Sequence, residues 1–186
     1  MKHHKMKHPL KVILFACTLL LPMGLLSAES APKLLDLNGG EHSLKEYLGK
    51  GKWLVVMVWA SDCHVCNQEV HEMVALHKAH KDKDVQVLGI AIDGYEGKKD
   101  VQAFIDRHKV NFPNLIDDGS VVMKEYAEKV GKQWYGWTPT FLMYDPKGEL
   151  SAQNIGAISQ ADIEKYLAEQ PKQVSKTPVS PAVEKG

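Results

Sequence analysis

Residues 53–66 read WLVVMVWASDCHVC and carry two features that together predict the fold. The first is an unbroken apolar run from Trp53 to Trp59, which is rich in strand-favouring residues and too short for a typical helix. Such a run is typical of a strand covered on both faces, as in a parallel sheet. The second is a pair of cysteines, Cys63 and Cys66, which follows the strand at the point where a helix is predicted to begin.

The rest of the domain alternates further strand and helix signals. A helix is predicted from Cys63 to His80, because apolar side chains recur there on one face at helical spacing. Ser43 and Ser159 are predicted to cap two more helices, the second in a capping-type arrangement with Asp162. Turn signals and periodicity predict the other elements, which are extended segments at 34–37, 85–92, 112–116, 140–144 and 150–155 and helices at 44–48, 98–108 and 120–130. This order predicts an α/β sandwich around a mixed sheet.

The two ends of the chain are predicted to lie outside that domain. Residues 1–28 have the order of a secretory signal peptide, with a basic flank, a short apolar stretch and small residues at its end. The stretch is short against the roughly 20 residues of a membrane span, and Pro22 interrupts it; an uncleaved anchor is the alternative. Cleavage would remove Cys17. Residues 171–186 carry three prolines and no periodic pattern, which predicts a flexible tail and a folded domain over 32–170.

The composition excludes several classes of protein. The formal net charge is zero, so nothing points to nucleic acid or an anionic membrane surface as a partner. Hydrophobic residues make up 44% of the chain, which is enough for a core that needs no disulfide scaffold. His3, His4 and His8 fall in the predicted signal peptide and are therefore not candidate metal ligands.

The position of the cysteine pair predicts redox chemistry. Backbone N–H groups at a helix N-terminus stabilise a thiolate, and the thiolate is the attacking species in disulfide exchange. Cys63 is therefore predicted to be the exposed nucleophile, and Cys66, one helical turn later, the covered residue that resolves the mixed disulfide. A protonated His64 would favour the Cys63 thiolate, whereas Asp62 would oppose it.

Two structural interpretations of the cysteine pair compete with the redox interpretation. A zinc site would need two more ligands at close spacing, and the later histidines, His71, His77, His80 and His108, supply no such pair. A purely structural disulfide across two residues would close too small a loop to stabilise the chain much. The redox reading is therefore preferred.

Two segments resemble those of a known superfamily. Residues 58–66, VWASDCHVC, resemble the W-A-x-x-C-x-x-C segment of thioredoxins, and residues 138–141, TPTF, resemble their cis-proline segment. Ser43-Leu44, Gly51-Lys52 and Glu69 resemble the TlpA/ResA branch of exported thioredoxin-like proteins, many of which are reductants in cytochrome c or oxidase assembly. The dipeptide His-Val between the cysteines and His71, in place of the usual proline, depart from that branch.

The resemblance implies a thioredoxin-like three-layer sandwich with a mixed central sheet, flanking helices and a strand–helix insert between Val85 and Pro139. It implies that the Thr138–Pro139 bond is cis and that this loop lies against the cysteine pair, where it can bind an extended substrate segment. The redox-active disulfide would carry the chemistry by itself, with no cofactor and no metal. The predicted substrate-binding residues are Trp59, His64, Val65, Trp137, Thr138 and Pro139.

Glu69 is the third predicted catalytic residue. In the TlpA/ResA branch a glutamate at this place in the helix takes the part of the buried strand aspartate of thioredoxin, whose position here is Met57. Independently, Glu69 lies one turn from Cys66 and from Met73, at the edge of the apolar stripe. A carboxyl group there can exchange protons with Cys66 during resolution. The alternative is an ordinary glutamate at the edge of a surface helix.

The function expected from these features is that of an exported, periplasmic thiol–disulfide oxidoreductase, a monomer that reduces disulfides in specific exported proteins. Its electrons would come from a membrane thiol donor such as a DsbD/CcdA-like protein. A dithiol oxidase or isomerase would use the same residues, and a Cu(I)-binding module would use Cys63, Cys66 and a nearby histidine. A thiol peroxidase is disfavoured, because Ala60 stands where that pattern has a threonine.

Two further sets of residues each have two possible interpretations. His77 and His80 lie near the apolar stripe of their helix and are either edge residues or a metal-binding pair, the first being preferred. Trp134, Tyr135 and Trp137 precede the proline loop and are either an apolar rim for a substrate chain or part of the core.

Overall fold

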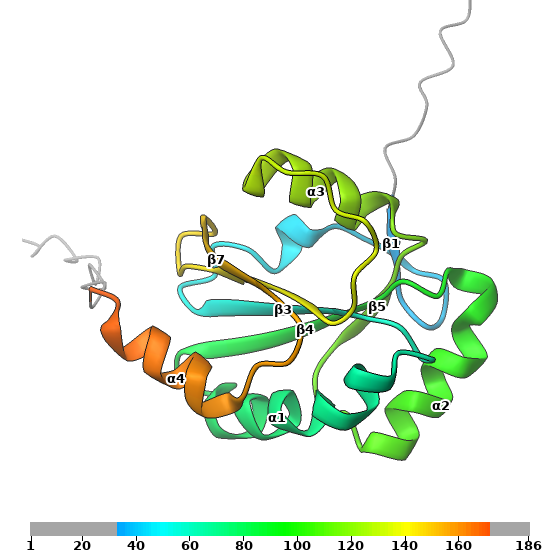
Figure 1. Ribbon diagram of the computed structural model, residues 1–186, viewed down its shortest axis with the longest axis horizontal. Coiled ribbons are helices and arrows are strands. Elements are labelled where there is room, and N and C mark those ends of the chain that lie inside the picture. The colour runs from blue at the N-terminus through cyan, green and yellow to red at the C-terminus, as the bar shows by residue number, and fades with distance from the viewer. Residues whose placement is uncertain (1–32, 172–186) are drawn as a thin grey trace, which may run out of the picture. The chain divides into compact units, whose positions relative to one another are not determined.

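The computed structural model describes residues 33–171, which form a seven-stranded mixed sheet with helices on both faces (Figure 1). The strand order is β2-β1-β5-β4-β3-β6-β7. The predicted signal peptide at 1–28 and, apart from Pro171, the predicted tail lie outside the described residues. No helix within 33–171 is long and apolar enough to cross a membrane.

The apolar run from Trp53 to Trp59 forms an interior strand of the sheet. β3 (Trp53–Trp59) pairs in parallel with β4 (Val85–Ala91) and antiparallel with β6 (Thr140–Tyr144). Apart from Trp53, every residue of β3 is buried. A strand flanked by two others and covered on both faces has no solvent-facing side, which explains why its sequence lacks polar alternation.

The other elements complete the sheet and its two covering layers. β7 (Leu150–Ile155) and the pair β1 (Leu34–Leu35) and β2 (Glu41–His42) form the edges. Two short 3₁₀ helices, η1 (Leu44–Glu46) and η2 (Tyr95–Gly97), precede β3 and α2 (Lys98–His108). The remaining elements are α1 (His64–His80), β5 (Asn114–Ile116), α3 (Ser120–Val130) and α4 (Gln160–Glu169).

The sheet separates two hydrophobic clusters. On one face, α1, α2 and α4 pack on alternate strand residues such as Met57 and Trp59. On the other face, α3 and η1 pack on the residues between them, such as Val56 and Val58 (Figure 1). This is the period of two that a strand imposes on its side chains. The predicted three-layer thioredoxin-like sandwich, with α2 and β5 as its strand–helix insert, is confirmed.

Most predicted elements are confirmed to within two residues at each end, whereas η1, η2 and β2 differ from the prediction. The segment after Ser43 is a single 3₁₀ turn rather than an α-helix, although Ser43 caps it in a full capping box with Glu46. β2 was not predicted, because two polar residues carry no strand period; it exists through its pairing with β1. Ser159 caps α4 as predicted, with its hydroxyl accepting from the Asp162 backbone N–H at 3.1 Å.

Candidate functional site

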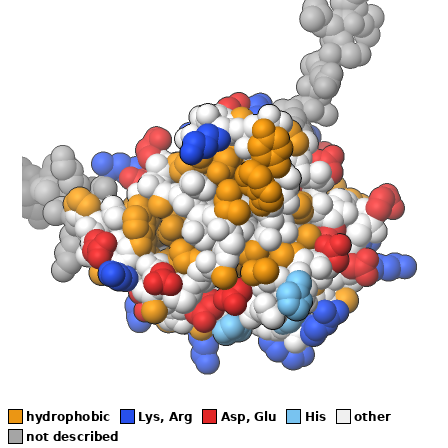
Figure 2. Space-filling model, viewed as in Figure 1, with side chains coloured by type: hydrophobic (Ala, Val, Ile, Leu, Met, Phe, Trp, Pro, Cys, Tyr) orange, Lys and Arg blue, Asp and Glu red, His pale blue; other side chains and the backbone are white. Residues whose placement is uncertain are grey.

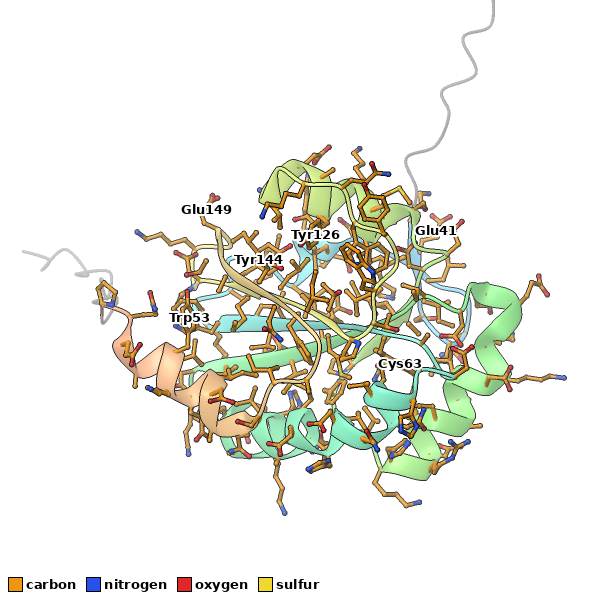
Figure 3. The ribbon with its side chains drawn as sticks, in the orientation of Figure 1. Glu41, Trp53, Cys63, Tyr126, Tyr144 and Glu149 are labelled. Atoms are coloured by element: carbon orange, nitrogen blue, oxygen red, sulfur yellow. A yellow bond between two sulfur atoms is a disulfide. The ribbon has the colours of Figure 1, made fainter. Side chains whose placement is uncertain are left out.

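The cysteine pair lies beyond the carboxyl end of β3, where α1 begins (Figure 3). Cys63 is the N-cap residue of α1, and its Sγ accepts a hydrogen bond from the backbone N–H of Cys66 at 3.1 Å. The two cysteines are joined in a disulfide, with their Cα atoms 5.2 Å apart. Cys66 is fully buried, whereas Cys63 is half-buried. The first sulfur is thus the accessible one and sits at the positive end of a helix dipole.

The turn that presents Cys63 is fixed by its own polar groups. Cys63 N–H donates to the carbonyl oxygen of Ala60 at 3.2 Å, which closes a four-residue turn. Ser61 donates both its backbone N–H and its hydroxyl to the carboxylate of Asp93, just beyond the end of β4. Asp93 was not among the predicted site residues. Its role was missed because the contact depends on the parallel pairing of β3 and β4.

The proline loop runs into β6, the antiparallel neighbour of β3. The Thr138–Pro139 peptide bond is cis, and Pro139 is buried. The register pairs Thr140 with Val58, so the loop lies beside the end of β3 from which the cysteine turn starts. Gly156 N–H donates to the Pro139 carbonyl at 2.9 Å, which ties the loop to the strand on its far side.

The three aromatic residues before the loop divide between core and surface. Trp134 is 2% exposed, and its indole N–H donates to the hydroxyl of Thr140 at 3.1 Å. That hydroxyl in turn donates to the carbonyl of Trp137 at 2.6 Å. Tyr135 and Trp137 are 65% and 49% exposed, with their ring centres 5.2 Å apart. Hydrophobic side chains gather on the surface over the segment between α3 and β6 (Figure 2).

The prediction that Trp59 binds substrate is wrong. Trp59 is only 1% exposed, and its ring stacks on Phe104 of α2 at a centroid distance of 4.1 Å. Its indole N–H donates to Asn114 Oδ1 at 3.1 Å. Because both its ring and its polar atom have partners inside the protein, Trp59 supports the redox turn from below. The other predicted substrate-binding residues remain accessible in part, with His64, Val65 and Trp137 exposed and Thr138 half-buried.

Glu69 lies on α1, one turn after Cys66 and one turn before Met73, and is half-buried. Its neighbours in the helix toward the sheet, Cys66, Val70 and Met73, are all buried. The carboxyl group therefore stands at the border between the core face and the wet face of the helix, as its position in the apolar pattern predicted. Its part in proton transfer stays a prediction.

The two histidines farther along α1 have separate structural partners. His77 is buried, and its Nδ1 accepts the backbone N–H of Val87 in β4 at 3.3 Å. Burial, and secondarily Lys81, lowers its pKa. His80 is bonded to Asp84 at 2.8 Å and to Glu164 of α4 at 3.0 Å. Burial opposes protonation of His80, but these hydrogen bonds outweigh it and raise its pKa.

The described residues also bear on the metal alternatives. Within 33–171, no group of three or more histidine, cysteine, aspartate or glutamate side chains is placed to hold a metal ion. The three-ligand set that a Cu(I) module would need is therefore not assembled around Cys63 and Cys66 in this disulfide form. His77 and His80 each bond to partners of their own, His77 to Val87 and His80 to Asp84 and Glu164.

A cavity of about 690 Å³ opens beside the redox turn. One wall is the turn itself, with Ser61 and Asp62, and the opposite wall is α2, with Asp100 and Arg107. The carboxylate of Asp93 lies at the end of β4 between them. The insert thus approaches the cysteine turn closely enough to form one side of its surroundings.

Comparison with known proteins places this geometry in a family. The model of the AhpC/TSA family matches residues 28–153, which is more than half of the chain. The chain belongs to the AhpC/TSA family. As a member of that thioredoxin-fold family with a Cys63–Cys66 pair at the start of a helix, it is a thiol–disulfide oxidoreductase of the TlpA/ResA type.

Several known proteins are similar to this AhpC/TSA protein. It is 32% identical over 134 residues to the thiol-disulfide oxidoreductase ResA of Geobacillus kaustophilus, covering 72% of this chain and 71% of the relative. A secreted disulfide oxidoreductase of Mycobacterium tuberculosis, described as homologous to E. coli DsbE, shares 25% identity and a TM-score of 0.56, covering 73% and 93% of the two chains. A thiol:disulfide interchange protein from Chlorobium tepidum shares the fold at 21% identity and a TM-score of 0.61, covering 76% and 97%.

Proposed function

We propose that this protein is an exported reductant that transfers two electrons from its Cys63–Cys66 dithiol to disulfides in specific partner proteins. One observation carries the proposal. A half-buried cysteine caps the N-terminus of α1, and its partner one turn later is fully buried. This asymmetry gives one sulfur access to a partner and reserves the other for resolution.

The reaction follows from the two positions. The Cys63 thiolate attacks one sulfur of the partner disulfide, forms a mixed disulfide and releases the other partner sulfur as a thiolate. Cys66, deprotonated, then attacks Cys63 Sγ, which re-forms the internal disulfide and releases the second partner thiolate. Glu69 accepts the Cys66 proton in this step. The partner gains two electrons and the protein ends in the disulfide form that the structure describes.

The partner segment binds along the cis-proline loop. The loop leads into β6 beside the redox turn, so an extended chain can add to it through backbone hydrogen bonds at Thr138. His64 and Val65, both exposed next to Cys63, border the attacking sulfur, and Trp137 offers a half-exposed ring next to the loop. Pro139 is buried and shapes the loop rather than presenting a side chain.

The resemblance to the TlpA/ResA branch supports the direction of the reaction, and the N-terminus and one neighbour support its place. A relative that is 32% identical to this chain is named ResA, and one protein with a similar solved structure is described as secreted. The order of residues 1–28 favours export to the periplasm, with a membrane-anchored form as the variant. A membrane thiol donor of the DsbD/CcdA kind would re-reduce the pair, and cytochrome c assembly is the process in which such a monomeric reductant would act.

A dithiol oxidase or isomerase is the second candidate. The observation that favours it is the exposed His64 between the cysteines. A cation at that place would stabilise the Cys63 thiolate, and a stabilised thiolate makes a more oxidising couple.

The reduction potential decides between the two. The mature domain would be equilibrated with glutathione or dithiothreitol buffers, and the redox state of Cys63 and Cys66 followed by mass after alkylation. We expect a value near or below that of thioredoxin, about −270 mV. A value near about −120 mV would assign the oxidase role instead. Absence of a reversible two-electron couple would contradict both.

A further inference from the structure

The side chain of Asn67 joins the redox turn to the insert helix α2. Asn67 follows Cys66 on α1, and its amide nitrogen donates to the carbonyl oxygen of Cys63 at 2.9 Å and to that of Ser61 at 3.1 Å. The Cys63 carbonyl also accepts the backbone N–H of Asn67 at 3.0 Å. One residue thus holds two carbonyl groups of the turn, one of them on the attacking cysteine.

The other end of the same amide is held by α2. Asn67 Oδ1 accepts from Nε2 of His108 at 2.9 Å and from a guanidinium N–H of Arg107 at 3.2 Å. Guanidinium groups only donate and backbone carbonyls only accept, so the amide has a single orientation that satisfies all four partners. The same argument makes His108 Nε2 a donor. The orientation of Asn67 is therefore determined by its partners on both sides.

The contact with α2 is reinforced by packing. The His108 ring lies 4.5 Å from that of Phe104, and Phe104 stacks on Trp59 at 4.1 Å. Trp59 is the last residue of β3, directly before the turn. Burial, and secondarily Arg107, lowers the pKa of His108 and so favours the neutral ring, which suits this apolar stack. α2 is thus fixed against the redox turn by a polar contact and an aromatic one.

From this geometry we infer that Asn67 is a positioning residue through which α2 holds the Cys63 turn in the shape that stabilises the Cys63 thiolate. The inference rests on the redox role of the cysteine pair. It goes beyond that role by assigning a function to Asn67, Arg107 and His108, none of which carries the chemistry itself.

The physical reason lies in the reduced state. Once the disulfide opens, Cys63 Sγ is no longer tethered to Cys66, and only the turn keeps it at the cap where it accepts the Cys66 N–H. Asn67 fixes the carbonyls before and at Cys63 and so restricts the backbone on both sides of that sulfur. Without it, the thiolate spends less time at the cap, its dipolar stabilisation falls, and the reduced form loses stability relative to the disulfide.

The test compares Asn67→Ala and Asn67→Asp with Gln68→Ala, an exposed neighbour on the same helix. The readouts are the rate at which iodoacetamide alkylates reduced Cys63, followed across pH, and the reduction potential of the pair. We expect Asn67→Ala to lower the rate near neutral pH about threefold to fivefold, the factor that corresponds to losing a helix cap, and to make the potential more negative. Asn67→Asp should do more, because a carboxylate then faces the two carbonyls. Gln68→Ala should match the unmodified protein.

Variants on α2 test the route through the insert. His108→Ala should lower the alkylation rate in the unmodified chain but not further in the Asn67→Ala background, since the two act through one contact. His108→Gln, which retains an N–H donor, should restore the rate. Gln102→Ala, on the same helix and bonded only to Asp106 in the described contacts, is the control.

The outcomes separate the inference from the function on which it rests. If the unmodified protein shows no reversible couple, the redox role itself is wrong. If the couple is normal and folded Asn67→Ala keeps both rate and potential, Asn67 is merely structural and the inference is wrong. If Asn67→Ala does not fold, the His108 pair decides: an unchanged rate in His108→Ala, or no recovery in His108→Gln, overturns it.

Discussion

The indole N–H of Trp59 donates to Oδ1 of Asn114 at 3.1 Å, and the bond passes over the backbone of Gly89. Trp59 lies on β3 and Asn114 on β5, with β4 between them. A Cβ atom on Gly89 would lie 1.9 Å from Asn114 Oδ1 and 2.9 Å from Trp59 Nε1. The glycine in the middle strand therefore makes room for a polar contact between the strands on either side.

Gly89→Ala is expected to destabilise the protein by about 1–3 kcal/mol, the usual range for overpacking a core. The added methyl group would break the Trp59–Asn114 bond and displace the tryptophan under the redox turn. Denaturant unfolding measures the loss.

Asn114→Ala provides the matching experiment. Alone it leaves the buried Trp59 N–H without its acceptor and should destabilise by about 1–3 kcal/mol. Combined with Gly89→Ala, it removes the atom that the new methyl group would strike. The two losses should thus be clearly less than additive, and full additivity would contradict the steric account.

The unequal burial of the two sulfurs predicts that the two cysteines differ in how well each traps a substrate as a mixed disulfide. Cys66→Ser should accumulate a mixed disulfide between Cys63 and a substrate peptide, because the half-buried sulfur can attack and nothing resolves the product. Cys63→Ser should form at least about tenfold less adduct, since a fully buried thiol is poorly accessible to a disulfide. Non-reducing electrophoresis and mass spectrometry measure both. Equal trapping by the two variants would reverse the assignment of attacker and resolver.

Glu69→Gln tests the proton transfer. The amide keeps the size of the side chain but cannot accept a proton, so the resolution step should slow roughly tenfold to hundredfold, at or below the usual range for general-base catalysis, with its pH dependence altered. Stopped-flow measurement of mixed-disulfide decay across pH separates this step from attack. Glu128→Gln makes the same change on the solvent side of α3, where the side chain is 57% exposed, and should leave the decay unchanged. An identical pH profile for both variants would remove Glu69 from the mechanism.

Trp137→Ala tests the aromatic surface next to the cis-proline loop. Its ring is 49% exposed and contacts Tyr135, so its loss should leave folding intact. Binding of a partner segment should weaken about fivefold, the value of one aromatic contact, and appear in KM rather than in kcat. Met123→Ala, also exposed at 47% but on α3, is the control. A change in kcat alone would argue against a binding role.

His77 and His80 predict opposite pH effects on stability. Burial lowers the pKa of His77, so its contribution is present above the ordinary value of about 6.5 and is lost as the pH falls. The partners Asp84 and Glu164 raise the pKa of His80 against burial, so its contribution is full below about 6.5 and is lost as the pH rises through the raised value.

Unfolding free energies of the two histidine variants across this pH range check the signs. His77→Ala should flatten the loss of stability on the acid side, and His80→Ala should flatten the loss on the alkaline side. The same slope in both variants would contradict the separate partners assigned to them. His71→Ala, exposed on α1, should leave both slopes unchanged.

Elements whose signal is local could be predicted from the sequence almost residue by residue. β3, α2, α3, β6 and β7 have the predicted bounds, because each has a complete apolar period and a clear turn or glycine beside it. The position of Cys63 at the start of a helix follows in the same way. The cis bond before Pro139 came only from the resemblance, since no local pattern distinguishes it from a trans bond.

Features that depend on distant partners could not be predicted. Trp59 was predicted to bind substrate because it directly precedes the redox turn, but its hydrogen-bond acceptor lies 55 residues away on another strand. Asn67 carries no signal of its own in the sequence, because its partners Arg107 and His108 lie 40 and 41 residues along the chain. Trp134 and Trp137 could not be told apart by spacing, and only the chain of hydrogen bonds through Thr140 turns one inward and the other outward.

The division of the core by the sheet has a consequence for how such a chain can diverge. The redox helix α1, the insert α2 and the support under the cysteine turn all belong to the cluster on one face, whereas α3 packs on the other. Changes among the α3 contacts, such as those of Val122 and Tyr126, are therefore insulated from the thiols by a layer of backbone. The α3 contacts can therefore be redesigned without disturbing the cysteine turn, as long as Trp134, whose indole N–H bonds Thr140 beside the proline loop, is retained.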